Sequence, residues 1–579
     1  MSAIHPVLIL IWIAIALLLR LTHLTTKPLW ADEISTLAFS LGNGYRTIPL
    51  DQILSLNDLL HPLQPNPQAT LQAVVQRLLT ESNHPPLYFV LTHLWLKLFP
   101  TMDGFVSLWP ARALSVGFSV ATVPAMFGLG WFAFRSRLVG HVSALLMALS
   151  PFGIYLAQEA RHYTLATLWI VASLSCLVAV AQCIQAQRPI PLWLCLLWIV
   201  SNGLGIATHY FVLFALVAEA IALLLWLALY PAKFHHPMEP QIPSRPGRSY
   251  VPRLVLVLGG TLATSGVWLP ILSSIRGTEL TRWIQAGEFD QSTWIDQVLR
   301  PVAGLITMLY LPPIQGIPNG VVLGMGGLLA LLLLWTLPLL RRGWQHQAQK
   351  PATRSMLVLF SSFVGSAIAL SLLLTLGLGI NVSSVFRYQF FYHPAVIVLL
   401  GLALANYWNR RAPGVPGLKQ VYLHGKCAIA LVLLCSFLGS ITVISNWGYQ
   451  KTHRPDQVAA AIHASWRSPT LVAIPHRSHA HSGRLMAIAW ELRRLNPTQA
   501  NQTLFLLAHQ PTSEVEPAIA TLQTALQRLP RPLDVWRINF RSQANPLSHQ
   551  VLQAAGCLPT MPLTSVDGYR YQRYECGNQ

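Results

Sequence analysis

The sequence predicts a polytopic α-helical membrane protein that ends in a small α/β domain. Of its 579 residues 53% are apolar and only 10% are charged, whereas an ordinary soluble domain carries about 25% charged residues. Eleven apolar runs are each long enough to cross a bilayer, which takes about 20 residues. The last 134 residues contain no such run. We therefore expect a membrane domain at 1–445, with a large first outer loop at 25–110, and an extracytoplasmic α/β domain at 446–579.

The apolar runs fix the order of the predicted spans. They are 6–24, 111–133, 139–157, 163–184, 191–208, 210–230, 254–272, 321–340, 355–377, 390–406 and 427–445. Two further apolar segments, 85–99 and 298–311, are shorter and carry prolines at an edge. If the short basic loops between spans lie inside, as the positive-inside rule expects, neither short segment crosses. We interpret both as juxtamembrane or re-entrant helices.

The formal net charge of +19 does not require a nucleic-acid partner. The basic residues stand in short groups between apolar runs, such as Arg341 and Arg342, and not on one amphipathic face. The chain has neither a GxGxxG nor a GxxxxGK[ST] motif, so no nucleotide site is expected. With the basic loops inside, the first loop and the C-terminal region face outside.

The C-terminal region alternates short strands with helical patterns. Strands are predicted at 470–475, 503–508 and 534–539, and helices at 455–466, 483–494 and 513–528. Cys557 and Cys576 fall in this polar region, where they could form a disulfide or remain free thiols. His476, His479 and His481 are interpreted as part of a flexible surface loop in preference to a metal site.

A carboxylate pair, Asp32 and Glu33, directly follows the first span. Adjacent acids at a membrane surface repel each other, which raises the pKa of one toward that of a general base, or they share a divalent cation. The structural alternative is a solvated helix N-terminus.

Four further outer segments carry polar or titratable residues at membrane depth, where such groups are costly and tend to be functional. Ordinary helix starts, loops and aromatic belts are the structural alternatives. An arginine flanked by aromatics suits a phosphate ester on a lipid, because guanidinium binds phosphate bidentately. The candidates are His84, Tyr88, Gln158, Glu159, Arg161, His162, Tyr163, His209, Tyr210, Arg387, Tyr388 and Tyr392. With the basic loops inside, all of them share the outer face with the carboxylate pair.

Several of these motifs, taken in order, resemble the GT-C superfamily of integral membrane glycosyltransferases. They are Arg20-Leu21, Leu29-Trp30-Ala31-Asp32-Glu33, His84-Pro85-Pro86-Leu87-Tyr88, Ser150-Pro151-Phe152, Gln158-Glu159-Ala160-Arg161-His162-Tyr163 and Arg387-Tyr388 before Pro394. The chain is most similar to the glycosyltransferase family 39-like group, which resembles protein O-mannosyltransferases and lipid A aminoarabinose transferases. The resemblance covers roughly residues 1–410.

The resemblance implies a GT-C fold and transfer of a sugar from a polyprenyl phosphate donor, usually with inversion. By position it makes Asp32 the general base or the member of the catalytic acid pair that faces the acceptor, with Glu33 in support. It places Glu159 and Arg161 on a second polar wall near the donor sugar or phosphate. Arg387 would hold the leaving phosphate, and the remaining candidates would line the cavity. The resemblance also implies a bacterial plasma membrane, a periplasmic active site and a protein, lipid or glycan acceptor. A divalent cation, bound by some relatives, is left open for Asp32 and Glu33.

Three alternatives stay open at this stage. A polyprenyl-linked glycan polymerase or ligase uses a similar carrier, and Arg387 suits either linkage. A lipid or solute transporter should place its polar groups near the bilayer midplane and often has internal repeats, which this sequence lacks. A passive membrane anchor for the C-terminal domain leaves the long first loop unexplained.

Overall fold

The computed structural model describes residues 4–230, 250–275, 294–380, 382, 385–412, 423–449, 451–467, 469–510, 516–540 and 547–577. The chain divides into two compact units, each built from several stretches of the sequence. The first comprises Met1–Leu24, Asn83–Tyr88 and Arg112–Tyr449, and the second comprises Thr25–Ser82, Phe89–Ala111 and Gln450–Gln579. The second unit therefore takes up most of the first loop, a grouping that the sequence analysis did not predict.

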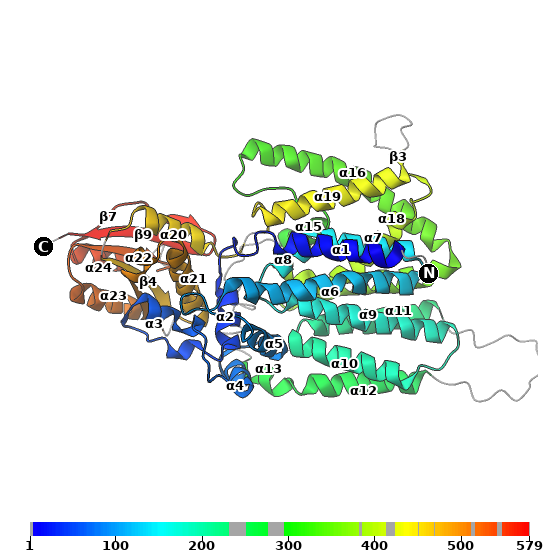
Figure 1. The fold of residues 1–579 in the computed structure, drawn as a ribbon, viewed down its shortest axis with the longest axis horizontal. Helices are drawn as coiled ribbons and strands as arrows, with labels where there is room; N and C mark the ends of the chain where they lie inside the picture. The colour runs from blue at the N-terminus through cyan, green and yellow to red at the C-terminus, as the bar shows by residue number, and fades with distance from the viewer. Residues whose placement is uncertain are drawn as a thin grey trace, which may run out of the picture. The chain divides into compact units, whose positions relative to one another are not determined.

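The first unit is a helical bundle whose helices run side by side (Figure 1). Its helices are α1 (Ile4–Leu21), α6 (Leu108–Phe134), α7 (Arg137–Leu149), α8 (Pro151–Ala157), α9 (Tyr163–Gln185), α10 (Leu192–Thr208), α11 (Val212–Leu229), α12 (Val251–Gly266), α13 (Leu269–Ile275), α15 (Trp294–Thr307), α16 (Asn319–Ala348), α17 (Pro351–Leu372), α18 (His393–Ala405) and α19 (Gly425–Ile444). A π-helical turn, Leu373–Gly377, extends α17, and a 3₁₀ segment, Phe386–Phe391, precedes α18. A two-stranded ribbon, β2 (Arg411–Ala412) and β3 (Leu423–His424), precedes α19.

Each predicted span coincides with a helix of this unit. Within the described residues seven helices are long and apolar enough to cross a membrane, or eight if the bent pair of α7 and α8 counts as one. The predicted spans at 191–208, 254–272 and 390–406 contain the shorter apolar helices α10, α12 and α18. The total of eleven spans stays a prediction. So does the juxtamembrane placement of 85–99 and 298–311, which contain α5 (Leu87–Leu96) and most of α15.

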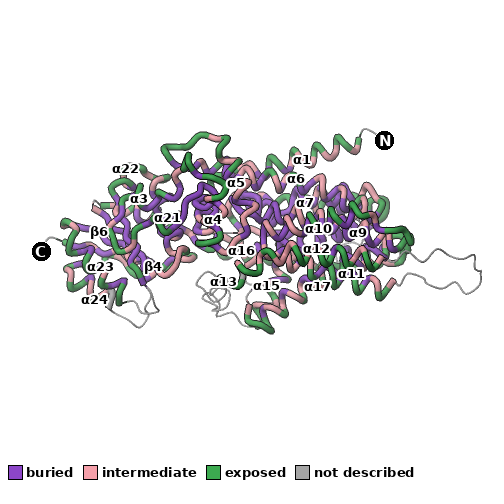
Figure 2. Tube along the Cα trace, turned by 90° about the horizontal axis from the view of Figure 1, so that it is seen from below, coloured by how far each residue is buried: buried purple, intermediate pink, exposed green. Residues whose placement is uncertain are grey.

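Apolar side chains cover the outside of the bundle as well as its core. Helix α1 is exposed along much of its length (Figure 2), and it includes Leu10 and Leu18, which are 64% and 68% exposed. Helix α18 is its opposite, since every residue from His393 to Leu404 is buried. A helix that is apolar on its exposed face is stable in lipid but not in water.

The break between α7 and α8 follows from two adjacent residues. Ser150 caps α8, because its Oγ accepts a hydrogen bond from the amide of Gly153 at 3.2 Å, and Pro151 occupies the first helical position, which it favours. The two helices meet at 55°. This bend turns the chain toward the polar segment that follows α8.

The second unit is an α/β fold around one sheet. The strands run in the order β1 (Ile53–Leu54), β5 (Thr503–His509), β4 (Thr470–His476), β6 (Leu533–Ile538), β9 (Tyr569–Cys576) and β7 (Cys557–Pro559), and β8 (Thr564–Val566) also pairs with β9. Strands β4, β5 and β6 are parallel, and the remaining pairings are antiparallel. The unit's helices are α2 (Ala31–Ser40), α3 (Leu56–Leu60), α4 (Leu71–Glu81), most of α5, α20 (Pro455–Ala464), α21 (His479–Leu495), α22 (Pro497–Asn501), α23 (Glu516–Arg528) and α24 (Leu547–Ala554).

The predicted α/β character of the C-terminal region is confirmed. The three predicted strands correspond to β4, β5 and β6, and the three predicted helices to α20, α21 and α23. Strand β1 was not predicted; it comes from the first loop and pairs Ile53 with Leu506 of β5. A disulfide joins Cys557 to Cys576 across the β7–β9 pair.

Candidate active site

Polar residues cluster in the segment between α8 and α9. Gln158, Glu159, Arg161, His162 and Tyr163 are all at most 2% exposed. Gln158 fastens this segment to the end of α1, because its Nε2 donates to the carbonyl of Arg20 at 3.2 Å and to that of Thr22 at 2.9 Å. Buried polar groups require such partners, so the segment is ordered by the bundle.

A single hydroxyl on α6 positions two of the candidates. Ser115 Oγ donates to the carbonyl of Arg161 at 3.0 Å and accepts the Arg161 amide at 3.3 Å. The hydroxyl of Tyr88 lies 2.7 Å from the same oxygen, and since the Ser115 proton is already engaged, Tyr88 donates. Ser115 therefore holds the Arg161 backbone beside the Tyr88 ring.

Three imidazoles lie next to Arg161. A guanidinium nitrogen of Arg161 lies 3.3 Å from Nε2 of His84. The His84 ring meets the His162 ring edge to face at 5.2 Å between centroids, and His162 is 4.4 Å from His209. The structure thus brings together residues from three separate segments of the sequence.

Burial keeps two of these imidazoles neutral. The pKa of His162 is lowered well below its usual range, first by loss of solvation and then by unfavourable electrostatic interactions of its protonated form with His209, Arg161, His84 and Arg387. Burial also lowers the pKa of His209 well below its usual range, with His84 and Arg161 adding to the effect. An imidazole surrounded by cations in a dry site stays uncharged, so the positive charge here belongs to the arginines.

Arg387 and Tyr388 lie at the same place. Arg387 is only 6% exposed and lies close enough to His162 to affect its titration. Its guanidinium hydrogen-bonds the hydroxyl of Tyr155, which also feels the charge of Glu159. The ring of Tyr388 packs against Phe211 at 4.7 Å and has the Arg387 guanidinium 5.8 Å from its centroid. Two arginines, one carboxyl group and neutral imidazoles therefore occupy one end of the first unit.

Two other candidates lie against different neighbours. The ring of Tyr210 packs edge to face on Trp268 at 6.1 Å. Tyr392 is buried and its ring meets that of Phe391 at 5.1 Å. Neither ring contacts the imidazole cluster among the ring contacts of the described residues, so a role in substrate binding for Tyr210 or Tyr392 stays a prediction.

Asp32 and Glu33 belong to the second unit, in the first turn of α2. Glu33 is fully buried and Asp32 is partly exposed. The segment before α2 is held by Glu491 of α21, whose Oε1 accepts the amide of Leu29 at 3.1 Å. Helix α2 also packs closely on α21, since a Cβ at Gly483 would come 3.1 Å from the Cβ of Ala31. The carboxylate pair thus sits on a firmly placed helix.

Three supporting residues of the first unit were not among the predicted site residues, although Arg20 was part of one of the motifs. Arg20 is fully buried and donates to Ser119 Oγ at 2.8 Å and to the carbonyls of Ala148 and Met147 at 2.8 and 2.9 Å. Ser115 and Tyr155 were missed as well, because they lie inside apolar helices. An arginine within an apolar run indicates a functional or structural role, and Arg20 is such a residue.

The histidines of the C-terminal region do not form a flexible surface loop, so that interpretation was wrong. His476 is the last residue of β4 and is buried, while His479 and His481 lie in the first turn of α21. The ring of His479 stacks on Tyr45 at 5.2 Å. Strand pairing and this stacking order a stretch whose composition resembles a loop.

Comparison of the whole chain with known proteins identifies its fold. No model of a known protein family matches the sequence, and no curated protein matches it. Among solved structures the chain is similar to ArnT from Cupriavidus metallidurans bound to undecaprenyl phosphate, with 12% identity, a TM-score of 0.53 and 99% of each chain covered. It also matches the Archaeoglobus fulgidus oligosaccharyltransferase tethered with an acceptor peptide, with 10% identity, a TM-score of 0.43, and 98% of this chain and 74% of that chain covered.

The fold and the buried polar cluster define an integral membrane protein of the polytopic helical class. More particularly, the likeness to ArnT over the full length of both chains shows the GT-C fold, as the sequence motifs implied. At this level of identity the likeness concerns the fold alone.

Proposed function

We propose that this protein is a membrane glycosyltransferase that transfers a sugar from a polyprenyl phosphate donor to an acceptor on the extracytoplasmic face. The observation that carries the proposal is the burial of Arg161 and Arg387 beside neutral His162 and His209 at one end of an apolar bundle. Guanidinium groups bind phosphate oxygens bidentately, so two of them buried close together suit a phosphate ligand. A lipid phosphate reaches such a site with its chain in the bilayer.

The donor phosphate fits the chemistry of this cluster. Guanidinium groups bind phosphate oxygens through paired hydrogen bonds. In the proposed reaction Arg387, with Arg161, neutralises the negative charge that grows on the phosphate as the bond between the anomeric carbon and the phosphate oxygen breaks. The bonding electrons leave with the polyprenyl phosphate. The solved ArnT structure, with the same fold, has undecaprenyl phosphate bound, which supports this donor class.

The acceptor hydroxyl must lose a proton as it attacks the anomeric carbon. We assign that proton to Asp32, with Glu33 in support, and we assign Glu159 to the donor wall beside Tyr155. Attack opposite the leaving phosphate inverts the anomeric carbon. Within the described part of the chain no group of three His, Cys, Asp or Glu side chains is placed to hold a metal ion, and the proposed mechanism routes no step through one.

The remaining candidates are assigned to the substrate cavity. Seven of them contact the arginine cluster or fix the segments that carry it, namely His84, Tyr88, Gln158, His162, Tyr163, His209 and Tyr388. Tyr210 and Tyr392 are assigned to its periphery. The sugar and the acceptor, whether protein, lipid or glycan, are left to experiment.

We also propose that the second unit faces the periplasm or exterior of a bacterial plasma membrane. The bond between Cys557 and Cys576 supports this placement, because structural disulfides persist in oxidising compartments and are rare in the cytosol. The five other cysteines, all in the first unit, are free thiols.

The test is transfer by the purified protein in detergent. Radiolabelled polyprenyl phosphate sugars are incubated with a membrane extract and with the parent, Asp32→Asn or Asp103→Asn. Asp103 lies in the same first loop but is 86% exposed at its side chain and pairs only on the surface with Arg493. We expect label to move with the parent and Asp103→Asn but not with Asp32→Asn. Equal transfer by Asp32→Asn would contradict the base, and no transfer from any donor would contradict the donor class.

A further inference from the structure

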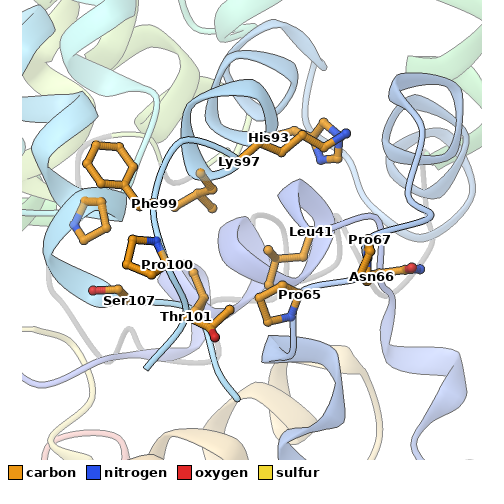
Figure 3. A pocket seen from close by; sticks show the side chains of 13 residues that line it. Leu41, Pro65, Asn66, Pro67, His93, Lys97, Phe99, Pro100, Thr101 and Ser107 are labelled. Carbon is orange, nitrogen blue, oxygen red and sulfur yellow. The ribbon is translucent and has the colours of Figure 1, made fainter. Parts of the chain in front are cut away.

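A cavity of about 210 Å³ lies within the second unit, away from the carboxylate pair of α2. Its wall comes from the residue that follows α2, from a proline-containing turn and from α5 with the chain that follows it (Figure 3). The lining residues are Leu41, Pro65, Asn66, Pro67, His93, Leu96, Lys97, Phe99, Pro100, Thr101, Val106, Ser107 and Pro110. Apolar cavities of about 150 Å³ bind a molecule such as benzene, so this one has room for a segment of an alkyl chain.

The lining is apolar except for a few placed polar groups. Lys97 is exposed, and its Nζ donates a hydrogen bond to the carbonyl of Ala69 at 3.3 Å. His93 is 3% exposed, and its Nδ1 lies 2.7 Å from the carbonyl of Ser40, so that nitrogen carries the proton. Its Nε2 is buried and has no hydrogen-bond partner among the described residues. Ligand pockets characteristically combine an apolar wall with a few such polar groups.

Four large apolar side chains close to the lining residues in the sequence are exposed. Leu94, Leu98, Met102 and Trp109 alternate with the lining residues along the chain and are 47%, 72%, 61% and 47% exposed. Exposed large apolar side chains on one short segment are a feature of interaction surfaces. Together with the tryptophan and the cation of Lys97, this composition is typical of a segment at the bilayer interface.

We propose that this cavity holds an alkyl chain of an anionic bilayer lipid, with Lys97 beside the lipid headgroup. The apolar wall accepts the chain, the exposed apolar side chains seat the segment in the bilayer interface, and the ammonium group favours a negative headgroup over a zwitterionic one. The site differs from the proposed donor site, whose arginines belong to the first unit. The inference does not depend on sugar transfer, because it concerns lipid binding alone.

Photo-crosslinking in vesicles tests the proposal. The full-length protein is reconstituted in phosphatidylethanolamine with a diazirine-bearing chain on either phosphatidylglycerol or phosphatidylcholine, and labelled peptides are mapped. We expect label within residues 93–107, stronger for phosphatidylglycerol by about fivefold, the effect of one lysine near an anionic headgroup. Lys97→Gln should equalise the two lipids. Label confined to helices of the first unit, or equal label from both lipids in the parent, would overturn the proposal.

Cavity-filling variants separate binding in the cavity from contact with its surface. Thr101→Trp and Ser107→Trp each place a large ring at a lining position that is not buried, so the fold should survive. Gln76→Trp places the same ring at an exposed position of α4 outside the lining. We expect the first two variants to lose most of the label and the third to keep it. Undiminished label in both filling variants would contradict the proposal even if the parent is labelled.

Discussion

A guanidinium nitrogen of Arg161 lies 3.3 Å from Nε2 of His84, joining residues 77 positions apart in the sequence. The contact requires an imidazole nitrogen that accepts a hydrogen bond, so Nε2 of His84 carries no proton when the contact is made. Asn83–Tyr88 is a short stretch of the first loop that groups with the first unit, whereas the stretches on either side of it belong to the second. Arg161 is therefore contacted by a short segment of the first loop that belongs to the helical bundle.

Two substitutions at His84 should distinguish the contribution of its ring from that of its hydrogen-bond acceptor, Nε2. His84→Phe keeps a ring next to His162 but removes the acceptor, whereas His84→Gln keeps a carbonyl oxygen that can accept from Arg161. Because a hydrogen bond to a charged group contributes about 1.5–3 kcal/mol, we expect His84→Phe to weaken binding of a polyprenyl phosphate by about 10- to 100-fold. His84→Gln should retain most of it. Equal affinities of the two variants, measured with the purified protein, would show that the hydrogen bond does not matter.

Arg387 should matter far more for the donor than an arginine on the surface of the bundle. Removing a buried guanidinium group from a phosphate site costs a charge-assisted, paired hydrogen bond. We expect Arg387→Ala to weaken polyprenyl phosphate binding by about 100-fold or more. Arg341→Ala, at an exposed position of α16, should leave the affinity unchanged. The reverse order of the two affinities would contradict the proposed orientation of the donor.

The helices could be predicted because each depends on its own composition. A span needs only a long apolar run, and the strands β4, β5 and β6 follow short apolar patterns bounded by turns. Strand β1 could not be predicted, since Ile53 and Leu54 become a strand only by pairing with β5, whose residues are about 450 positions later. Local patterns carry no information about such distant pairing.

The candidate site was predicted by residue type and not by geometry. Arg161, His162 and Arg387 were found because charged or titratable residues are rare in apolar surroundings. Ser115 was missed because a serine inside an apolar helix is unremarkable until the fold places its hydroxyl against the Arg161 backbone. The ordered placement of the histidines near β4 was missed for a similar reason, because it depends on strand pairing.

Reduction of the disulfide should destabilise the second unit. The bond closes a loop with a sequence separation of 19 residues, and such a loop contributes about 3 kcal/mol by restricting the unfolded chain. We expect Cys557→Ser to lower the thermal unfolding temperature and to abolish the effect of a reducing agent on it. Cys183→Ser, which removes a free thiol of the first unit, should leave both measurements as in the parent. An unchanged unfolding temperature in Cys557→Ser would mean that the bond adds no stability.

Acid should destabilise the strand that ends in His476. Burial, with the nearby charges of His479 and His509, lowers the pKa of His476 to about 4, although Asp51 opposes the shift. The unfolded chain, in which a histidine has a pKa of about 6.5, therefore binds this proton first as the pH falls. The contribution of His476 is fully present above about pH 6.5 and is lost as the pH falls toward 4, at about 1.4 kcal/mol per pH unit.

The measurement is the unfolding free energy of the full-length protein at pH 7 and pH 5. We expect His476→Phe to reduce the loss of stability between these two pH values. Ile474→Val changes the same strand without removing a titrating group, so it should lower stability equally at both. A pH dependence identical in His476→Phe and in the parent would exclude His476 as its source.

The hold of Glu491 on the segment before α2 should be required for both stability and transfer. Its Oε1 accepts the Leu29 amide, which is buried, and its other oxygen lies 3.3 Å from Nε of Arg494. Glu491→Leu would leave the amide without this acceptor, at a cost of about 1–3 kcal/mol, and would loosen the helix that carries Asp32. We therefore expect faster hydrogen exchange in residues 29–40 and slower sugar transfer. Glu491→Gln keeps an oxygen for the amide and should retain most of both, and Arg494→Gln, at a partly exposed partner, should cost less than about 1 kcal/mol. Protection of residues 29–40 that is unchanged in Glu491→Leu would show that α2 is placed by its packing on α21 alone.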